Sequence, residues 1–208
     1  MAAPKPLLPR LVAAAPDAVT AGFFLWVWIA PLSLGEGSVR TATLIMLVEF
    51  LLVHASGFLG AVTLASIVSR GKRLAALLGF GLFYSLFIGA FMLAFKAWWP
   101  AAVFGWLLVG KFAQVLTCVD DRAAQRQMAA WGASVLFYIL GVFLTLFLPL
   151  PRLGIDAATI PKLGLTGAGV WVDDPHRVVA FGVLYFAALA WYKWVDPAVP
   201  SNSRRGAS

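Results

Sequence analysis

Charge is scarce in this 208-residue chain. Only 12% of its residues are Asp, Glu, Lys or Arg, against about 25% in soluble domains. Hydrophobic residues make up 62% of the chain. A soluble globule of this size cannot bury so many, because roughly a quarter to a third of its surface stays exposed. The same composition excludes intrinsic disorder. The sequence therefore predicts a protein whose solvent is lipid.

Cysteine, histidine and catalytic motifs are also scarce. The single cysteine, Cys118, excludes a disulfide within the chain and a structural zinc site built on cysteines. Two histidines, His54 and His176, leave little for catalytic metal chemistry. The GxSxG, HExxH, Walker A and CxxCH motifs are missing. The sequence thus predicts no catalytic residue and no cofactor, haem at His54 being the weaker alternative, and a non-enzymatic role is favoured.

Long apolar stretches dominate what is present, and six of them are long enough to be spanning helices. They are residues 17–34, 39–69, 74–95, 101–119, 128–150 and 178–195. The first is the weakest, since prolines interrupt the region before it, and five spans remain if it is not a helix. We expect Asp17 to cap it. Residues 1–196 are therefore predicted to form one all-α polytopic transmembrane bundle, followed by a disordered basic cytoplasmic tail at 197–208.

The basic residues indicate which way the bundle faces. With the N-terminus inside, ten Lys and Arg lie in cytoplasmic segments and five in outer ones, while Lys111 lies within a span. The excess of basic residues on one side places both termini in the cytoplasm. It also accounts for the net charge of +7 without nucleic acid, so the partner is the lipid bilayer. Short loops and no transit signal make a cell inner (cytoplasmic) membrane the default.

Three ionisable residues lie inside predicted spans: Glu49, His54 and Lys111. Such groups are expensive in lipid, so they face the protein interior and mark function. At 1.5 Å per residue, Glu49 lies roughly 12 Å and Lys111 roughly 15 Å below the outer surface, which makes a Glu49–Lys111 pair reasonable. His54 lies about 140° around the helix from Glu49 and faces elsewhere. A histidine bonded to a neighbouring helix is its favoured interpretation.

Small and polar side chains accompany these groups. Ser56 shares the face of Glu49, Gln114 follows Lys111 by one turn, and Tyr138 lies on a polar face of the fifth span. These residues are predicted to line a polar cavity between the second, fourth and fifth spans. The alternatives are ordinary packing seams of small residues and a structural ion pair that fixes the helices.

The outer loop, residues 151–177, is the one sizeable segment outside the spans. Asp173, Asp174 and His176 are close enough in sequence to bind a cation weakly. The favoured interpretation is that Asp174 caps the sixth span, with Pro175 in its first turn. Long ordered loops are often functional, but this loop could simply cap the bundle.

Two functions remain open from the sequence. The first is permeation or transport of a proton, an ion or a small solute through the polar cluster of Glu49, His54, Lys111, Gln114, Ser56 and Tyr138. The second is a non-catalytic membrane subunit or assembly factor, which works through partner proteins or as a homo-oligomer. An embedded enzyme or haem protein using His54 is the third and weakest hypothesis.

Overall fold

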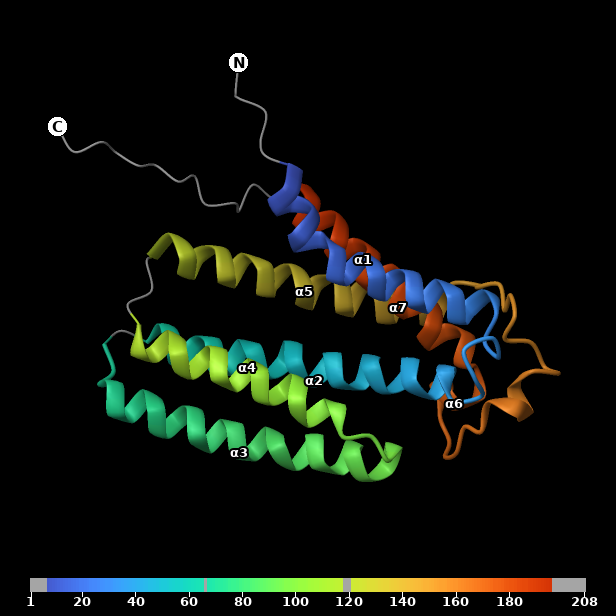
Figure 1. The fold of residues 1–208 in the computed structure, drawn as a ribbon, viewed down its shortest axis with the longest axis horizontal. Coiled ribbons are helices and arrows are strands. Elements are labelled where there is room, and N and C mark those ends of the chain that lie inside the picture. The colour runs from blue at the N-terminus through green and yellow to red at the C-terminus, as the bar shows by residue number, and fades with distance from the viewer. Residues whose placement is uncertain (1–6, 66, 118–120, 196–208) are drawn as a thin grey trace, which may run out of the picture.

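The structure is a computed structural model, and it describes residues 7–65, 67–117 and 121–195 (Figure 1). These residues form helices and connecting turns without a strand. The long helices are α1 (Leu7–Ile29), α2 (Ser38–Leu64), α3 (Arg70–Phe95), α4 (Trp99–Leu116), α5 (Asp121–Phe147) and α7 (Pro175–Val195), and the short ones are η1 (Ile160–Leu163) and α6 (Val170–Asp173). The six long helices are long and apolar enough to span a membrane, which confirms the predicted all-α bundle, including its first span.

The first helix begins earlier than predicted. α1 starts at Leu7, ten residues before the expected start, and Pro16 lies inside it. Asp17 is therefore not an N-cap. It lies within the helix and is only 8% exposed. Prolines are tolerated inside membrane helices, where neighbouring groups satisfy the freed backbone, so the proline was the wrong signal for this boundary.

Other boundaries also differ from the prediction, and two of them bear on the site. α2 ends at Leu64, five residues before the expected end, and α5 begins at Asp121, seven residues before its expected start. The extension of α5 contains Ala, Arg and Gln, which favour helix in water as well as in lipid. A hydropathy pattern detects where lipid contact begins, and a helix can begin before that point.

The six long helices run back and forth along one axis (Figure 1). Residues 148–169 lie at one end, here called the loop end. α2 and α4 end, and α3 and α5 begin, at the opposite end, and α1 begins and α7 ends on that side as well. α1 packs along α7, α3 packs on α4, and α2 contacts α3, α4, α5 and α7. α2 is therefore the central helix, and it joins an α1–α5–α7 group to an α3–α4 group.

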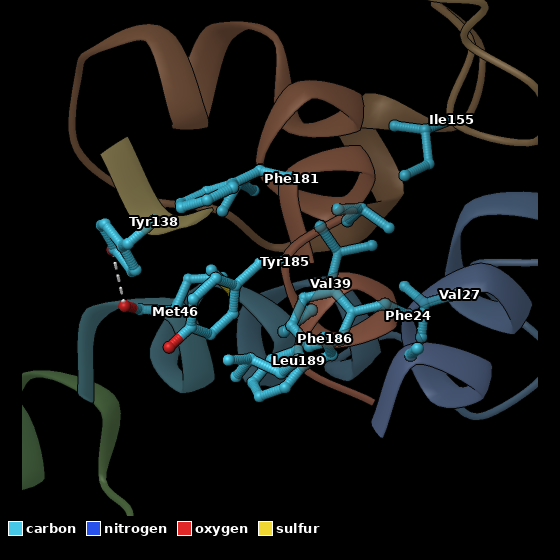
Figure 2. Close-up of a cluster of buried hydrophobic side chains, with 14 of the residues drawn as sticks. Phe24, Val27, Val39, Met46, Tyr138, Ile155, Phe181, Tyr185, Phe186 and Leu189 are labelled. Atoms are coloured by element: carbon cyan, nitrogen blue, oxygen red, sulfur yellow. Dashed lines mark hydrogen bonds between the residues drawn. The ribbon is translucent and has the colours of Figure 1, made fainter. Parts of the chain in front are cut away.

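The densest packing lies where α7 meets α1, α2 and α5 (Figure 2). Rings of Phe24, Tyr138, Phe181, Tyr185 and Phe186 pack together there. Two helical glycines make room for these rings. A Cβ on Gly141 would lie 2.6 Å from the ring of Phe181, and one on Gly182 would overlap the ring of Phe24. Small residues thus let aromatic rings fill the core of the bundle.

The outer loop closes the loop end of this core. Ile155 and Leu163 are 0% and 1% exposed and belong to the same apolar cluster. The Gly154 N–H donates to the Trp28 carbonyl (3.0 Å), and the Trp28 indole N–H donates to the Pro151 carbonyl (3.1 Å). Hydrogen bonds from Thr159 hold the pKa of the exposed Asp156 carboxyl below its usual range. The loop is therefore an ordered cap on the bundle.

Arginine side chains cap the C-terminal ends of three helices. Arg73 donates to the Thr63 carbonyl at the end of α2. Arg177 donates to the last carbonyls of α5, and Arg40 to the Ala94 carbonyl near the end of α3. A cation at a helix C-terminus satisfies free carbonyls and complements the helix dipole. Part of the basic excess therefore serves the fold.

The outward faces of the long helices are apolar. Leu82, Leu93, Trp106 and Phe147 are 70%, 82%, 80% and 78% exposed. A water-soluble protein rarely exposes so much contiguous apolar surface. These faces and the lengths of the helices are compatible with an integral, multi-pass membrane protein.

Candidate functional site

A polar cavity of about 610 Å³ lies between α2, α4 and α5. This is where the sequence predicts one. Its polar lining consists of Glu49, Ser56, Lys111, Gln114, Gln127 and Ser134. Four of these six belong to the polar cluster predicted from the sequence. Ser134 lies on the same predicted polar face of the fifth span as Tyr138, and only Gln127 was not predicted. The side chains of Trp106 and Trp131 complete the wall together with smaller apolar groups.

Lys111 is the most unusual group in this cavity. Its side chain is 6% exposed, although ammonium groups are almost never buried without a partner. No described side chain forms a salt bridge or a hydrogen bond with it. Its Nζ lies beside Gly60 of α2, where an added Cβ would be 3.8 Å from the Nζ. The cation is thus buried against the cavity with its bonding capacity unused by the described residues.

Two glutamines line the same cavity as this ammonium. Gln114 Nε2 donates to Gln127 Oε1 across the α4–α5 boundary (3.2 Å). Gln127 Nε2 lies as close to Gly60 as the Lys111 Nζ does, so two donor groups converge on one glycine. Gln114 Oε1 is buried without a described partner. The layer formed by Lys111, Gln114 and Gln127 therefore presents an ammonium, the N–H donors of Gln127 and one amide oxygen without a described partner. The ammonium and the N–H donors are the chemistry that binds an anion.

Glu49 does not pair with Lys111, as the sequence suggested it could. The Tyr185 hydroxyl donates to Glu49 Oε1 (2.6 Å), and Lys111 lies at the level of Gly60, eleven residues or about 16 Å further along α2. The estimate from the sequence took both spans to begin at the same depth. In the structure α4 begins well short of the start of α2 (Figure 1), which moves Lys111 toward the opposite end.

Trp131 separates this cavity from a second hollow. Its indole N–H donates to the Val53 carbonyl (2.9 Å), and a Cβ on Gly57 would lie 2.7 Å from its ring. The ring lines the polar cavity on one side and an apolar hollow of about 420 Å³ on the other. The close approach at Gly57 allows one side chain of α5 to divide the space beside α2.

His54 and Tyr138 lie outside the polar cavity and line the apolar hollow. The His54 ring lies on another face of α2 than Glu49, in agreement with the helical wheel, and its Nδ1 is 2.9 Å from the Tyr84 hydroxyl of α3. The Tyr138 hydroxyl donates to the Met46 carbonyl in the core (3.0 Å; Figure 2). The structure therefore divides the predicted cluster into two places.

The carboxylates of the outer loop are engaged by arginines. Asp174 Oδ1 accepts from Arg152 (2.9 Å), and Oδ2 lies 3.5 Å from Arg177. His176 Nδ1 lies 3.8 Å from Asp174 Oδ1, and the Asp173 side chain is exposed. Within the described ranges no three His, Cys, Asp or Glu side chains are grouped to hold a metal ion. Asp174 directly precedes Pro175, the first residue of α7, so the expected N-cap position is correct, but its carboxylate forms ion pairs.

Sequence reasoning missed three polar groups. Lys193 Nζ forms a salt bridge with Asp17 Oδ2 (2.6 Å), which joins α7 to α1. Gln127 lies just before the predicted start of the fifth span at residue 128, and it reaches the cavity from α5, which begins earlier than expected. Tyr185 is an ordinary aromatic residue in an apolar span, and nothing in the sequence points from it to Glu49. Comparisons of this chain with models of known protein families, with curated proteins and with solved structures find no match.

Proposed function

We propose that this protein binds a small anion in the cavity between α2, α4 and α5 and carries it across a membrane. The observation that carries the proposal is the burial of Lys111 against a polar cavity, without a described anionic partner. A buried charge is retained at a considerable cost in free energy. A ligand that brings the opposite charge offsets that cost each time it binds.

The lining explains why the ligand is an anion rather than a cation. Lys111 Nζ and Gln127 Nε2 place donors at the same point of α2. Glu49, the acidic group of the cavity, lies about 16 Å away along α2 and accepts a hydrogen bond from Tyr185. A cation at the Lys111 level would meet like charge, whereas a carboxylate, phosphate or sulfonate would meet an ammonium and an amide N–H.

The length of the cavity favours a carrier over an open channel. From the level of Lys111 to Glu49 it covers about 16 Å, roughly half of the 30 Å hydrocarbon thickness of a bilayer. No residue of α2 before Glu49 lines the cavity, and Met46 and Val48 are 0% and 2% exposed. Transport therefore requires a second conformation, and turnover is expected to be slow.

We also propose that the end of the bundle opposite the outer loop faces the cytoplasm, in a cell inner membrane. Support comes from the basic residues at that end, which include Arg70, Lys72 and Arg73 in the first turn of α3. The anion site near this end would then load from the cytoplasmic side.

The test is anion uptake into protein-containing phosphatidylcholine vesicles. The probes are labelled phosphate, sulfate, methanesulfonate and octanesulfonate, all of which stay ionised near neutral pH. Wild type is expected to take up at least one of them faster than protein-free vesicles. Lys111→Gln should lower that rate by about tenfold or more, because a charged hydrogen bond is lost. Lys111→Arg should retain part of it.

Lys162→Gln is the matched control, because Lys162 is an exposed lysine in the outer loop. Its uptake should equal that of wild type. Uptake by wild type no faster than in protein-free vesicles for all four probes contradicts permeation. That result favours the other hypothesis, a non-catalytic membrane subunit that acts through partner proteins.

A further inference from the structure

The polar and apolar parts of the cavity are separated along the bundle. Lys111 and Gln114 lie five and two residues before Leu116, the last residue of α4, or about 8 and 3 Å from the helix end. Gln127 lies six residues from the start of α5, or about 9 Å. The donor groups therefore lie within about 10 Å of the helix ends that are opposite the outer loop.

The apolar part lies deeper and opens sideways. Val103 and Trp106 line the cavity from the first half of α4 and are 41% and 80% exposed. Gly110, one residue before Lys111, also lines the cavity and is exposed. Lining residues with such exposure in the middle of a spanning helix show that the cavity reaches the lateral surface. In a bilayer that surface meets hydrocarbon.

We infer that the ligand of this cavity is an anionic amphiphile of the acidic phospholipid class, which reaches the site from the bilayer. Its charged headgroup binds Lys111 and Gln127, and a hydrocarbon chain lies along Val103 and Trp106. The inference rests on the proposed anion site and names the ligand class of that site. A headgroup at the helix end with a chain toward mid-membrane is the orientation that a lipid already has in its leaflet.

Two further observations favour this ligand over a free anion. A small hydrated anion would fill only the end near Lys111 and leave the apolar wall at Val103 and Trp106 without a partner. Glu49 lies at the deep end of the cavity, and its Oε1 accepts a hydrogen bond from Tyr185 of α7. The hydrocarbon chain of the ligand would therefore meet a carboxylate with an oxygen that is already bonded to the protein. A choline headgroup would place a second cation beside Lys111, so phosphatidylcholine should bind poorly.

The experiment is native mass spectrometry of the full chain, released from a neutral detergent after incubation with one probe at a time. The probes are phosphatidylglycerol and phosphatidylcholine with identical chains. Inorganic phosphate is tested separately, by the rise in unfolding temperature that it causes. Wild type should retain one phosphatidylglycerol and at least about tenfold less phosphatidylcholine, and Lys111→Gln should lose the preference.

A pair of glycines on α4 tests access from the side. A Cβ added at either Gly110 or Gly105 would have no atom within 4 Å, so we expect both variants to fold. Gly110 lines the cavity and Gly105 does not. Gly110→Leu should therefore reduce phosphatidylglycerol retention by about tenfold or more, while Gly105→Leu should match wild type.

Three results would contradict the inference that the ligand is an anionic amphiphile. The first is equal retention of phosphatidylglycerol by wild type and Lys111→Gln, and the second is equal retention of the two lipids by wild type. The third is stabilisation of wild type, but not Lys111→Gln, by inorganic phosphate without retention of phosphatidylglycerol. This last result keeps the anion site and identifies a free anion as its ligand. If neither probe distinguishes wild type from Lys111→Gln, the anion site itself fails.

Discussion

The two sides of α2 have opposite packing. Toward α7 the space is filled by aromatic rings, and residues such as Phe24 and Phe181 are 0% exposed. Toward α4 and the first half of α5 the space is a cavity of about 610 Å³ with a buried lysine. In membranes, helices associate through close packing and hydrogen bonds rather than through the hydrophobic effect. Close packing on the α7 side, and in the apolar cluster that α2 and α4 share with α3, therefore holds the bundle together, whereas the cavity is free to bind.

The buried ionisable groups follow the same division. On the filled side, Asp17 of α1 forms a 2.6 Å salt bridge with Lys193 of α7. On the unfilled side, Lys111 has no described partner. A salt bridge holds two helices together, whereas a buried charge without a partner lowers the stability of the fold. The difference indicates which charged residues support structure and which support function.

The largest expected effect comes from placing the same methyl group on each side. Gly182→Ala should lower the free energy of unfolding by about 1–3 kcal/mol, because its Cβ would overlap the fully buried ring of Phe24. Gly57→Ala should change it by less than about 1 kcal/mol, since the Trp131 ring has hollows on both sides into which it can shift. Thermal unfolding in one detergent measures both.

Gly22→Ala is the control for these variants, because Gly22 of α1 has open space around it. It should be neutral or gain up to about 1 kcal/mol from helix propensity. If Gly57→Ala destabilises the protein as much as Gly182→Ala does, the two sides of α2 are equally tight and the comparison is wrong.

A smaller effect is expected from two tyrosine hydroxyls that lie near each other. Tyr185→Phe removes the donor to Glu49 Oε1 and should cost about 1.5 kcal/mol, because a buried carboxylate loses a charged hydrogen bond. Tyr138→Phe removes a donor to the Met46 carbonyl and should cost about 0.5 kcal/mol, the low end for a neutral hydrogen bond. Denaturant titration of both variants gives the ranking. Equal losses would mean that Glu49 has another donor.

Much of the fold could be predicted from the sequence. Apolar runs are long and strongly marked, so the six helices and their order follow from hydropathy. The exact ends could not be predicted. Pro16 and Asp17 read as a helix start in water, yet both lie inside α1. The start of α5 was missed because a helix in solvent has no apolar signal at its first turn.

The site could be predicted only in part. Glu49, Ser56, Lys111 and Gln114 were identified because polar groups in apolar spans are rare, and they do line one cavity. The Glu49–Lys111 pair was wrong because the relative depth of two helices is a tertiary property, which no residue spacing records. Tyr185, the actual partner of Glu49, lies 136 residues away and carries no distinguishing pattern.

The last pair of variants is the sharpest test of the comparison, because the two expected effects have opposite signs. Asp17→Asn should lower the free energy of unfolding by about 1 kcal/mol, since it breaks the bond to Lys193. The value is modest because the Lys193 side chain is 41% exposed and solvent screens the pair. Lys111→Met should raise the free energy of unfolding by about 1 kcal/mol, because it removes a buried ammonium without a described partner. Lys162→Met, at an exposed position, is expected to leave the free energy of unfolding unchanged. A loss of stability in Lys111→Met would show that Lys111 stabilises the fold and would contradict its assignment to ligand binding.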